Sequence, residues 1–237
     1  MPHHNIYLDN NATAPLRPEV MRAMTEALQN HGNASSIHAP GRQARARIEM
    51  ARNAVAGLVG AKAEEVIFTS GGTEANNLAL RGVTADRVFV SAIEHDSVLR
   101  AAPEDSVIIP VLASGIVDLA ALDALLGACT VPALVSLMLA NNETGIVQPV
   151  AQAAQIAHAH GARLHCDAAQ AVGKILVDCA ALDTDLLTVS AHKFGGPQGA
   201  GALIIRNGIY LAAQMRGGGQ ERGHRGGTEN IAAIAGF

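Results

Sequence analysis

Short apolar segments alternate with segments of helical spacing along most of this 237-residue chain. Seven apolar segments, many of them rich in β-branched residues, are predicted to be strands: residues 66–69, 87–91, 107–110, 133–138, 163–167, 186–190 and 202–205. Helices are predicted before and between them, over residues 18–28, 42–59, 74–80, 119–126 and 150–160. This alternation predicts an α/β fold, with helices on both faces of a mostly parallel seven-stranded sheet.

Polar side chains lie at or soon after the ends of several predicted strands. Thr69, His95, Asn141, Asp167 and Lys193 all occupy such positions. Ligands of open α/β sheets bind outside the carboxyl ends of the strands. The sequence therefore predicts a binding site at this edge of the sheet.

Lys193 lies in a glycine-rich loop, Ser190-Ala191-His192-Lys193-Phe194-Gly195-Gly196-Pro197, which joins the last two predicted strands without a crossover helix. These two strands are therefore expected to be antiparallel. Schiff-base chemistry needs an amine that is neutral part of the time, and desolvation beside apolar side chains lowers a lysine pKa. Ser190 and His192 are hydrogen-bonding groups that can hold an anion. The alternative is an ordinary surface loop with a solvated lysine.

A second segment, Thr69-Ser70-Gly71-Gly72-Thr73-Glu74, leads from a predicted strand through a glycine turn into a predicted helix. Backbone N–H groups and a hydroxyl group converge at such a helix N-terminus, which favours a phosphate. The glycine spacing is neither that of a dinucleotide fingerprint nor that of a P-loop.

Asp167 ends the predicted strand of residues 163–167, and Gln170 follows it. A carboxylate in this position can pair with a protonated pyridine nitrogen, and this pairing makes the ring an electron sink. The alternative role for Asp167 is to cap the helix that follows.

Together these motifs resemble the class V pyridoxal-phosphate enzymes, and specifically the cysteine desulfurases of the NifS/IscS type. The resemblance spans residues 6–237 and rests on segments that occur in the order of the family: residues 8–13, 32–38, 69–77, 94–95, 141–145, 167–170, 190–193, 217–223 and 225–228. It implies the large domain of the fold-type I transferases over residues 1–237, with residues 1–40 packing toward a C-terminal small domain. That small domain, which carries the persulfide cysteine of the family, is expected to be missing, so the chain is expected to be truncated. The alternative is a natural short form with its own dimer partner.

The resemblance implies pyridoxal 5′-phosphate as the cofactor and L-cysteine as the substrate, with L-alanine and an enzyme persulfide as products. Lys193 would form the Schiff base, and His95 would stack on the ring and act in acid–base steps, although a histidine before a helix is more often a cap. Asp167 would hold the ring nitrogen, and Asn141 and Gln170 would donate to the phenolic oxygen. The implied phosphate ligands are Gly72, Thr73, Ser190, His192 and, from the other subunit of a homodimer, Thr228. A sulfur-acceptor protein of an iron–sulfur or thiolation pathway is a further implied partner.

Composition limits the remaining functional classes. A net charge of −4 without charged blocks gives no sign of binding to nucleic acid or to a membrane surface. No apolar run approaches the length of a transmembrane helix, and Met1-Pro2-His3-His4 lacks the basic start of a secretory signal. A cytoplasmic protein is predicted.

The three cysteines, Cys129, Cys166 and Cys179, show no CxxC spacing, so neither a metal site nor a disulfide framework is predicted. The alternation of side chains along a strand places the side chain of Cys166 on the face opposite that of Asp167. Since none of the cysteines matches the persulfide loop of the family, the chain is expected to be inactive alone. Two alternatives remain open: a non-catalytic cofactor-binding fragment, and a related class V lyase or aminotransferase acting on another amino acid.

Overall fold

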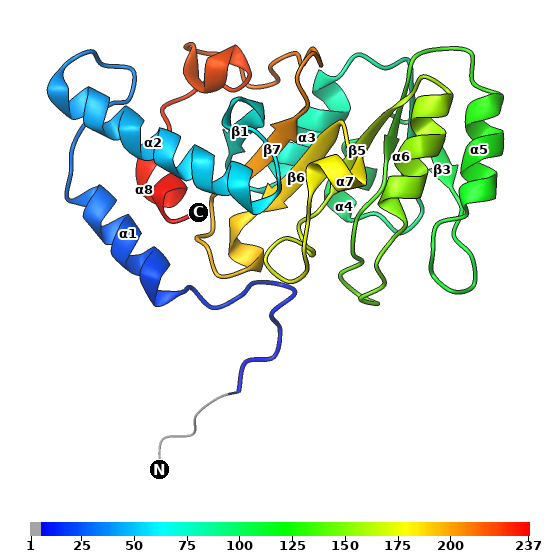
Figure 1. Ribbon diagram of the computed structural model, residues 1–237, viewed down its shortest axis with the longest axis horizontal. Helices are drawn as coiled ribbons and strands as arrows, with labels where there is room; N and C mark the ends of the chain where they lie inside the picture. The colour runs from blue at the N-terminus through cyan, green and yellow to red at the C-terminus, as the bar shows by residue number, and fades with distance from the viewer. Residues whose placement is uncertain (1–5) are drawn as a thin grey trace.

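A seven-stranded sheet forms the centre of the computed structural model, which describes residues 6–237 (Figure 1). Its strands are β1 (Val66–Thr69), β2 (Arg87–Ser91), β3 (Val107–Ile109), β4 (Ala133–Ser136), β5 (Arg163–Asp167), β6 (Leu186–Ser190) and β7 (Gly201–Ile205). They lie in the order β1-β7-β6-β5-β4-β2-β3. Strand β7 runs antiparallel to both of its neighbours, and the other pairs are parallel. The predicted mostly parallel sheet with an antiparallel final pair is confirmed. Met1–His4, on which the prediction about a secretory signal rests, lies outside the described residues.

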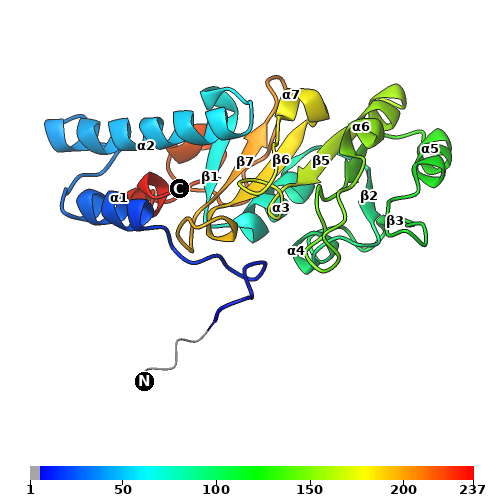
Figure 2. The same ribbon diagram turned by 60° about the horizontal axis from the view of Figure 1, so that its bottom comes forward.

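Helices cover both faces of the sheet, as predicted. They are α1 (Pro18–Leu28), α2 (Ala39–Leu58), α3 (Gly72–Gly82), α4 (Asp96–Leu99), α5 (Leu119–Gly127), α6 (Val150–Ala159), α7 (Cys179–Leu182) and α8 (Ile231–Ala235), with short 3₁₀ turns η1 (Ala63–Glu65), η2 (Ala191–Lys193) and η3 (Gln220–Gly223). Figure 2 shows α6 and α7 on one side of the sheet and α3 and α4 on the other. Both faces of the central strands are therefore buried, which explains why these strands read as continuous apolar runs.

The bounds of some elements differ from the prediction for local reasons. Helix α2 begins at Ala39 rather than at residue 42, because Nδ1 of His38 caps it by accepting a hydrogen bond from the Gly41 N–H at 3.2 Å. Strand β4 ends at Ser136 rather than at residue 138, since the Met138 N–H donates to the Glu94 carboxylate instead of to a strand.

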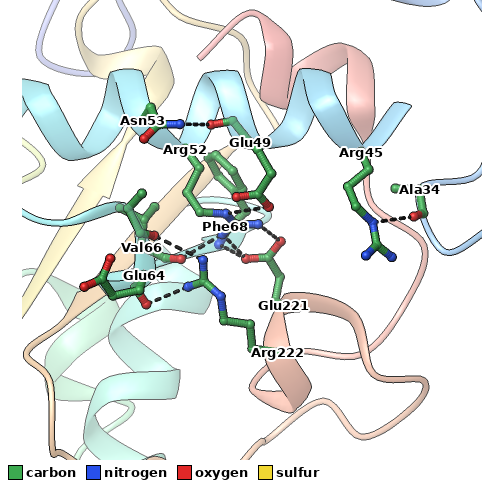
Figure 3. Close-up of polar contacts among 11 residues, drawn as sticks. Ala34, Arg45, Glu49, Arg52, Asn53, Glu64, Val66, Phe68, Glu221 and Arg222 are labelled. Carbon is green, nitrogen blue, oxygen red and sulfur yellow. Dashed lines mark hydrogen bonds and ion pairs between the residues drawn. The ribbon is translucent and has the colours of Figure 1, made fainter. Parts of the chain in front are cut away.

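A buried ion pair covers the outer edge of β1, the end strand of the sheet (Figure 3). The guanidinium of Arg52 on α2 donates to the Val66 carbonyl at 2.7 Å, and the carboxylate of Glu221 accepts from the Phe68 N–H at 2.8 Å. Arg52 and Glu221 also bind each other through two hydrogen bonds of 2.7 and 2.9 Å. Together they satisfy strand groups that would otherwise be open to pairing with another chain.

Glu221 belongs to a segment of residues 217–228, named the strap, which passes over this edge of the sheet. Glu221 and Arg222 both have positive φ angles, 44° and 56°. Such angles are uncommon for residues with a side chain and persist only when surrounding contacts hold them. The buried pair supplies such a contact, so it links α2, β1 and the strap.

We predict that Glu221→Gln lowers the free energy of unfolding by about 3–5 kcal/mol, because it leaves the Arg52 charge buried without its main partner. Urea unfolding measures this change. The control is Glu49→Gln: Glu49 also contacts Arg52, at 3.2 Å, but its side chain is 48% exposed. Glu49→Gln should lower the free energy of unfolding by no more than about 1 kcal/mol. Equal effects of the two variants would contradict the structural role given to Glu221.

Candidate active site

A cavity of about 640 Å³ lies at the carboxyl ends of the parallel strands. The N-terminal segment of residues 8–12, the start of α3 and the loops after β2, β4, β5 and β6 all contribute to its wall. Most of the predicted site residues line it: Gly72, Thr73, His95, Asp167, Gln170, Ser190, His192 and Lys193. A second hollow, of about 460 Å³, shares Gly72, Thr73, Ser190 and His192 with the first.

Lys193 ends the η2 turn that follows β6. Its Nζ donates to the backbone carbonyls of Asn11 at 2.8 Å and Ala12 at 3.1 Å. Partial burial lowers the pKa of Lys193, while the charges of Asp167 and Asp9 act in the opposite direction. An amine with a lowered pKa is neutral, and so nucleophilic, over a wider pH range.

Asp167 is the last residue of β5 and is almost fully buried. Its Oδ1 accepts from the Ala169 N–H at 2.9 Å, and its Oδ2 accepts from Nδ2 of Asn76 at 2.7 Å. Burial raises the pKa of Asp167, while these two hydrogen bonds and the charges of His95 and Lys193 act to lower it. The bond to Ala169 closes a turn and does not cap a helix, because the next helix, α7, begins only at Cys179, and the Asp167 side chain lines the cavity.

The turn into α3 forms the opposite wall. Gly71 has a φ of 153°, a conformation that favours glycine, and Gly72 opens the helix. A Cβ atom on Gly72 would stand 3.3 Å from Cβ of Ser190, so a side chain there would crowd the wall. The first-turn N–H groups of a helix have no partner within it. This corner can therefore receive an anion, with Ser190 and His192 beside it.

His192 and His95 each make local contacts as well as lining the cavity. Nδ1 of His192 lies 3.2 Å from Oγ1 of Thr13, and burial together with the neighbouring Lys193 lowers the pKa of His192. His95 caps α4, its Nδ1 accepting from the Ser97 N–H at 3.1 Å. The capping alternative for His95 is thus present in the structure together with the position at the cavity wall.

The structure does not bring every predicted residue to the cavity. Asn141 is buried, and its Oδ1 accepts from the N–H groups of Glu143 at 3.0 Å and Thr144 at 2.9 Å while its Nδ2 donates to the Ile93 carbonyl. It organises a turn, and its neighbours Ala140 and Asn142 line the cavity instead. Gln170 does line the cavity, but its Nε2 is engaged with the Asn11 carbonyl at 2.8 Å. Thr228 is exposed on the strap and lies outside the cavity.

Three contributors to the site were not predicted. Asn76 orients Asp167 and lies on the buried side of α3, and a polar residue on an otherwise apolar helix face was the available signal. Glu94 is buried beside His95, and burial, reinforced by the charge of Asp167, raises the pKa of Glu94 to about 8. Lys174 donates to Oδ1 of Asn11 at 3.0 Å and to Gln170, which ties the N-terminal segment to the loop after β5.

None of the three cysteines lines the cavity. Cys166 is fully buried in the core on the face opposite that of Asp167, as predicted, and burial raises the pKa of its thiol. Burial likewise raises the pKa of Cys179 to about 11. Cys129 is partly buried and donates to the Val131 carbonyl.

Residues 6–237 contain no group of three or more histidine, cysteine or acidic side chains placed to hold a metal ion. Within the same range, no helix has the length and apolar character needed to cross a membrane.

We predict that the amine of Lys193 reacts with an aldehyde at a lower pH than an ordinary lysine, because burial lowers its pKa. Reductive methylation with formaldehyde is carried out at several pH values, and peptide mass spectrometry measures the methylated fraction of Lys193. The midpoint is the pH at which this fraction is half of its maximum. Asp167→Asn should move this midpoint further down, since it removes a negative charge that favours the ammonium form. An upward shift in that variant would contradict the proximity of the two side chains.

Comparison with known proteins identifies the relatives of this fold and site. The family model described as Aminotransferase class-V matches residues 6–237. A cysteine desulfurase of Cereibacter sphaeroides is 46% identical over 98% of this chain and 63% of its own length. The NifS-like protein of Rickettsia africae superposes with a TM-score of 0.92 at 39% identity, covering 98% of this chain and 67% of the other. A structure of SspA in complex with cysteine has a TM-score of 0.90 at 31% identity, with coverages of 98% and 71%. The chain thus spans 62–63% of the length of curated relatives that it matches.

Proposed function

This chain belongs to the aminotransferase class-V family, and on that premise we propose that it forms the cofactor-binding part of a cysteine desulfurase that uses pyridoxal 5′-phosphate. One observation carries the proposal. The amine of Lys193, the buried carboxylate of Asp167 and the N-terminus of α3 line the same cavity. An aldehyde, a ring nitrogen and a phosphate are the groups that such a trio would bind. The similarity to SspA, whose structure contains cysteine, supports L-cysteine as the substrate.

When bound, the cofactor supplies an aldehyde for an amine and a ring that draws electrons from the Cα of an amino acid. In this proposal Lys193, which lines the cavity, would accept a proton at that Cα and return it. Asp167 would hold a proton at the ring nitrogen, and Asn76 fixes the orientation of its carboxylate. His95 lines the cavity wall, and in this proposal it would cover a ring face.

The phosphate would be held by the N–H groups of Gly72 and Thr73 and by the side chains of Ser190 and His192. Gln170 could donate to the cofactor through the second hydrogen of its Nε2, while the first stays bound to the Asn11 carbonyl. Both hydrogens of the Asn141 Nδ2 are engaged, with the Ile93 carbonyl and the Met138 sulfur, so Asn141 would have to give up one of these bonds. The N-terminal segment, which now holds Lys193 through two carbonyls, would also release that amine.

The proposal extends to the assembly. Thr228 is exposed and lies outside the cavity of its own chain, which supports a role at the phosphate of a second subunit in a homodimer. A sulfur-acceptor protein and a cytoplasmic location are parts of the same proposal.

A second candidate is a cofactor-binding chain that transfers no sulfur itself, or a class V lyase or aminotransferase acting on another amino acid. The positions of the cysteines favour it, because neither Cys129, Cys166 nor Cys179 lines the cavity. Sulfur transfer needs a thiolate that reaches the substrate.

We expect pyridoxal 5′-phosphate to give a visible absorbance band with this chain and an adduct at Lys193 that borohydride makes permanent. Lys193→Ala should lose both, because it removes the amine that faces Asp167. The matched control is Lys174→Ala, which removes a neighbouring ammonium that is bound to Asn11 and Gln170. Peptide mass spectrometry locates the adduct. Trapping at Lys174 in the Lys193→Ala variant would contradict the assignment.

The chain on its own should release no alanine from L-cysteine at an enzymatic rate, since none of its thiols lines the cavity. Quantifying alanine and sulfide after incubation with the cofactor and L-cysteine tests this expectation. Release that disappears in Cys129→Ser, Cys166→Ser or Cys179→Ser would identify one of these thiols as the sulfur acceptor and exclude the second candidate.

A further inference from the structure

The strap, residues 217–228, is held to the rest of the chain by two arginine–carboxylate pairs. The first is the buried pair of Glu221 with Arg52 at the edge of β1 (Figure 3). The second joins Arg225 of the strap to Glu74 of α3. In the first pair the strap contributes the acid and in the second the base, so the two pairs fix both the position and the direction of the strap.

Arg225 and Glu74 form a bidentate ion pair. Nε of Arg225 lies 2.8 Å from Oε1 of Glu74, and Nη2 lies 3.3 Å from Oε2. Oε2 of Glu74 also accepts from the Ser70 N–H at 2.7 Å. Burial raises the pKa of Glu74, but the hydrogen bonds from Arg225 and Ser70 outweigh it, and the pKa lies below its usual value. Glu74 is therefore ionised at neutral pH.

The position of Glu74 creates an electrostatic conflict with the proposed phosphate site. Glu74 follows Thr73 directly in the first turn of α3 and lines the smaller hollow together with Gly72, Ser190 and His192. An unpaired carboxylate there would repel a phosphate dianion, because like charges a few ångströms apart interact strongly near a protein surface. The carboxylate is nevertheless useful, since it satisfies the Ser70 N–H where the chain turns into the helix.

Arg225 resolves this conflict. Its guanidinium neutralises the charge of Glu74 and leaves the hydrogen bond from the Ser70 N–H in place. The side chains of Arg225 and Glu74 are 18% and 19% exposed. We propose that Arg225 is a positioning residue of the phosphate site, which acts through Glu74 by neutralising it and by fixing the strap against the turn that binds the phosphate. This inference rests on the proposed function and adds to it a residue that does not line either hollow.

Two ligands that differ only in the phosphate test the inference: pyridoxal 5′-phosphate and pyridoxal. Each is titrated into the full chain, followed by visible absorbance and borohydride trapping at Lys193. In Arg225→Gln the dissociation constant for pyridoxal 5′-phosphate should rise about tenfold, which corresponds to a loss of about 1.4 kcal/mol of binding free energy. The constant for pyridoxal should stay within roughly twofold, since Coulomb repulsion needs the phosphate charge.

Two further variants separate charge from general structure. The double variant Glu74→Gln with Arg225→Gln should recover most of the lost affinity for pyridoxal 5′-phosphate, because it removes the carboxylate that Arg225 neutralises. Arg222→Gln is the matched control: Arg222 lies on the same strap but donates to the carbonyls of Glu64 and Ala63 rather than to Glu74. Its affinities for both ligands should equal those of the unaltered chain.

The outcomes distinguish the inference from the function on which it rests. If the unaltered chain traps neither ligand at Lys193, both are wrong. If it traps them but Arg225→Gln weakens both ligands equally, or neither, the role of Arg225 is wrong and the proposed function stands. The role is also wrong if the double variant binds pyridoxal 5′-phosphate no better than Arg225→Gln alone.

Discussion

Burial of the sheet on both faces is the constraint on which the rest of this structure depends. Apolar residues on each side of β4, β5 and β6 are covered by helices, so a polar group within these strands must find a protein partner. One row of such groups exists: His165 on β5 contacts Ser136 on β4 and Thr188 on β6. Burial lowers the pKa of His165 to about 3, so this imidazole stays neutral and joins three strands.

Ionisable side chains of the cavity wall, Asp167 and Lys193 among them, lie at or soon after the ends of strands or on the N-terminal segment. Asp167 ends β5 and Lys193 follows the adjacent parallel strand β6, which brings an acid and an amine to one cavity. At this position Asp167 is largely shielded from water and accepts hydrogen bonds from Asn76 and from the Ala169 N–H. Lys193 gains a lowered pKa beside a carboxylate that opposes the shift. The sheet thus sets both the geometry and the electrostatics of the site.

Features of the fold that follow from local pattern could be predicted from the sequence, and features that follow from long-range contacts could not. The bounds of α1, β1, β2, β5 and β6 match the prediction, because apolar periodicity ends there at a turn or a polar residue. Helices α4 and α7 have four residues each, too few to show a period. The placement of Lys193 and Asp167 followed from the rule about strand ends. That the Asn141 amide is engaged in a turn depends on Ile93 and Thr144, whose positions no local pattern reveals.

The covering of β1 by Arg52 and Glu221 has a consequence for the order in which the chain can fold. Strand β1 is made early during synthesis, but its neighbour in the sheet, β7, is made much later. Glu221, which accepts a hydrogen bond from the Phe68 N–H, lies 153 residues after Phe68. Until both have left the ribosome, the two flanks of this apolar strand stay open. Contacts of such long sequence separation slow folding, and open strands attract other chains. The emerging chain is therefore exposed to misassembly at its first strand during the whole interval in which the residues between β1 and the strap are being made.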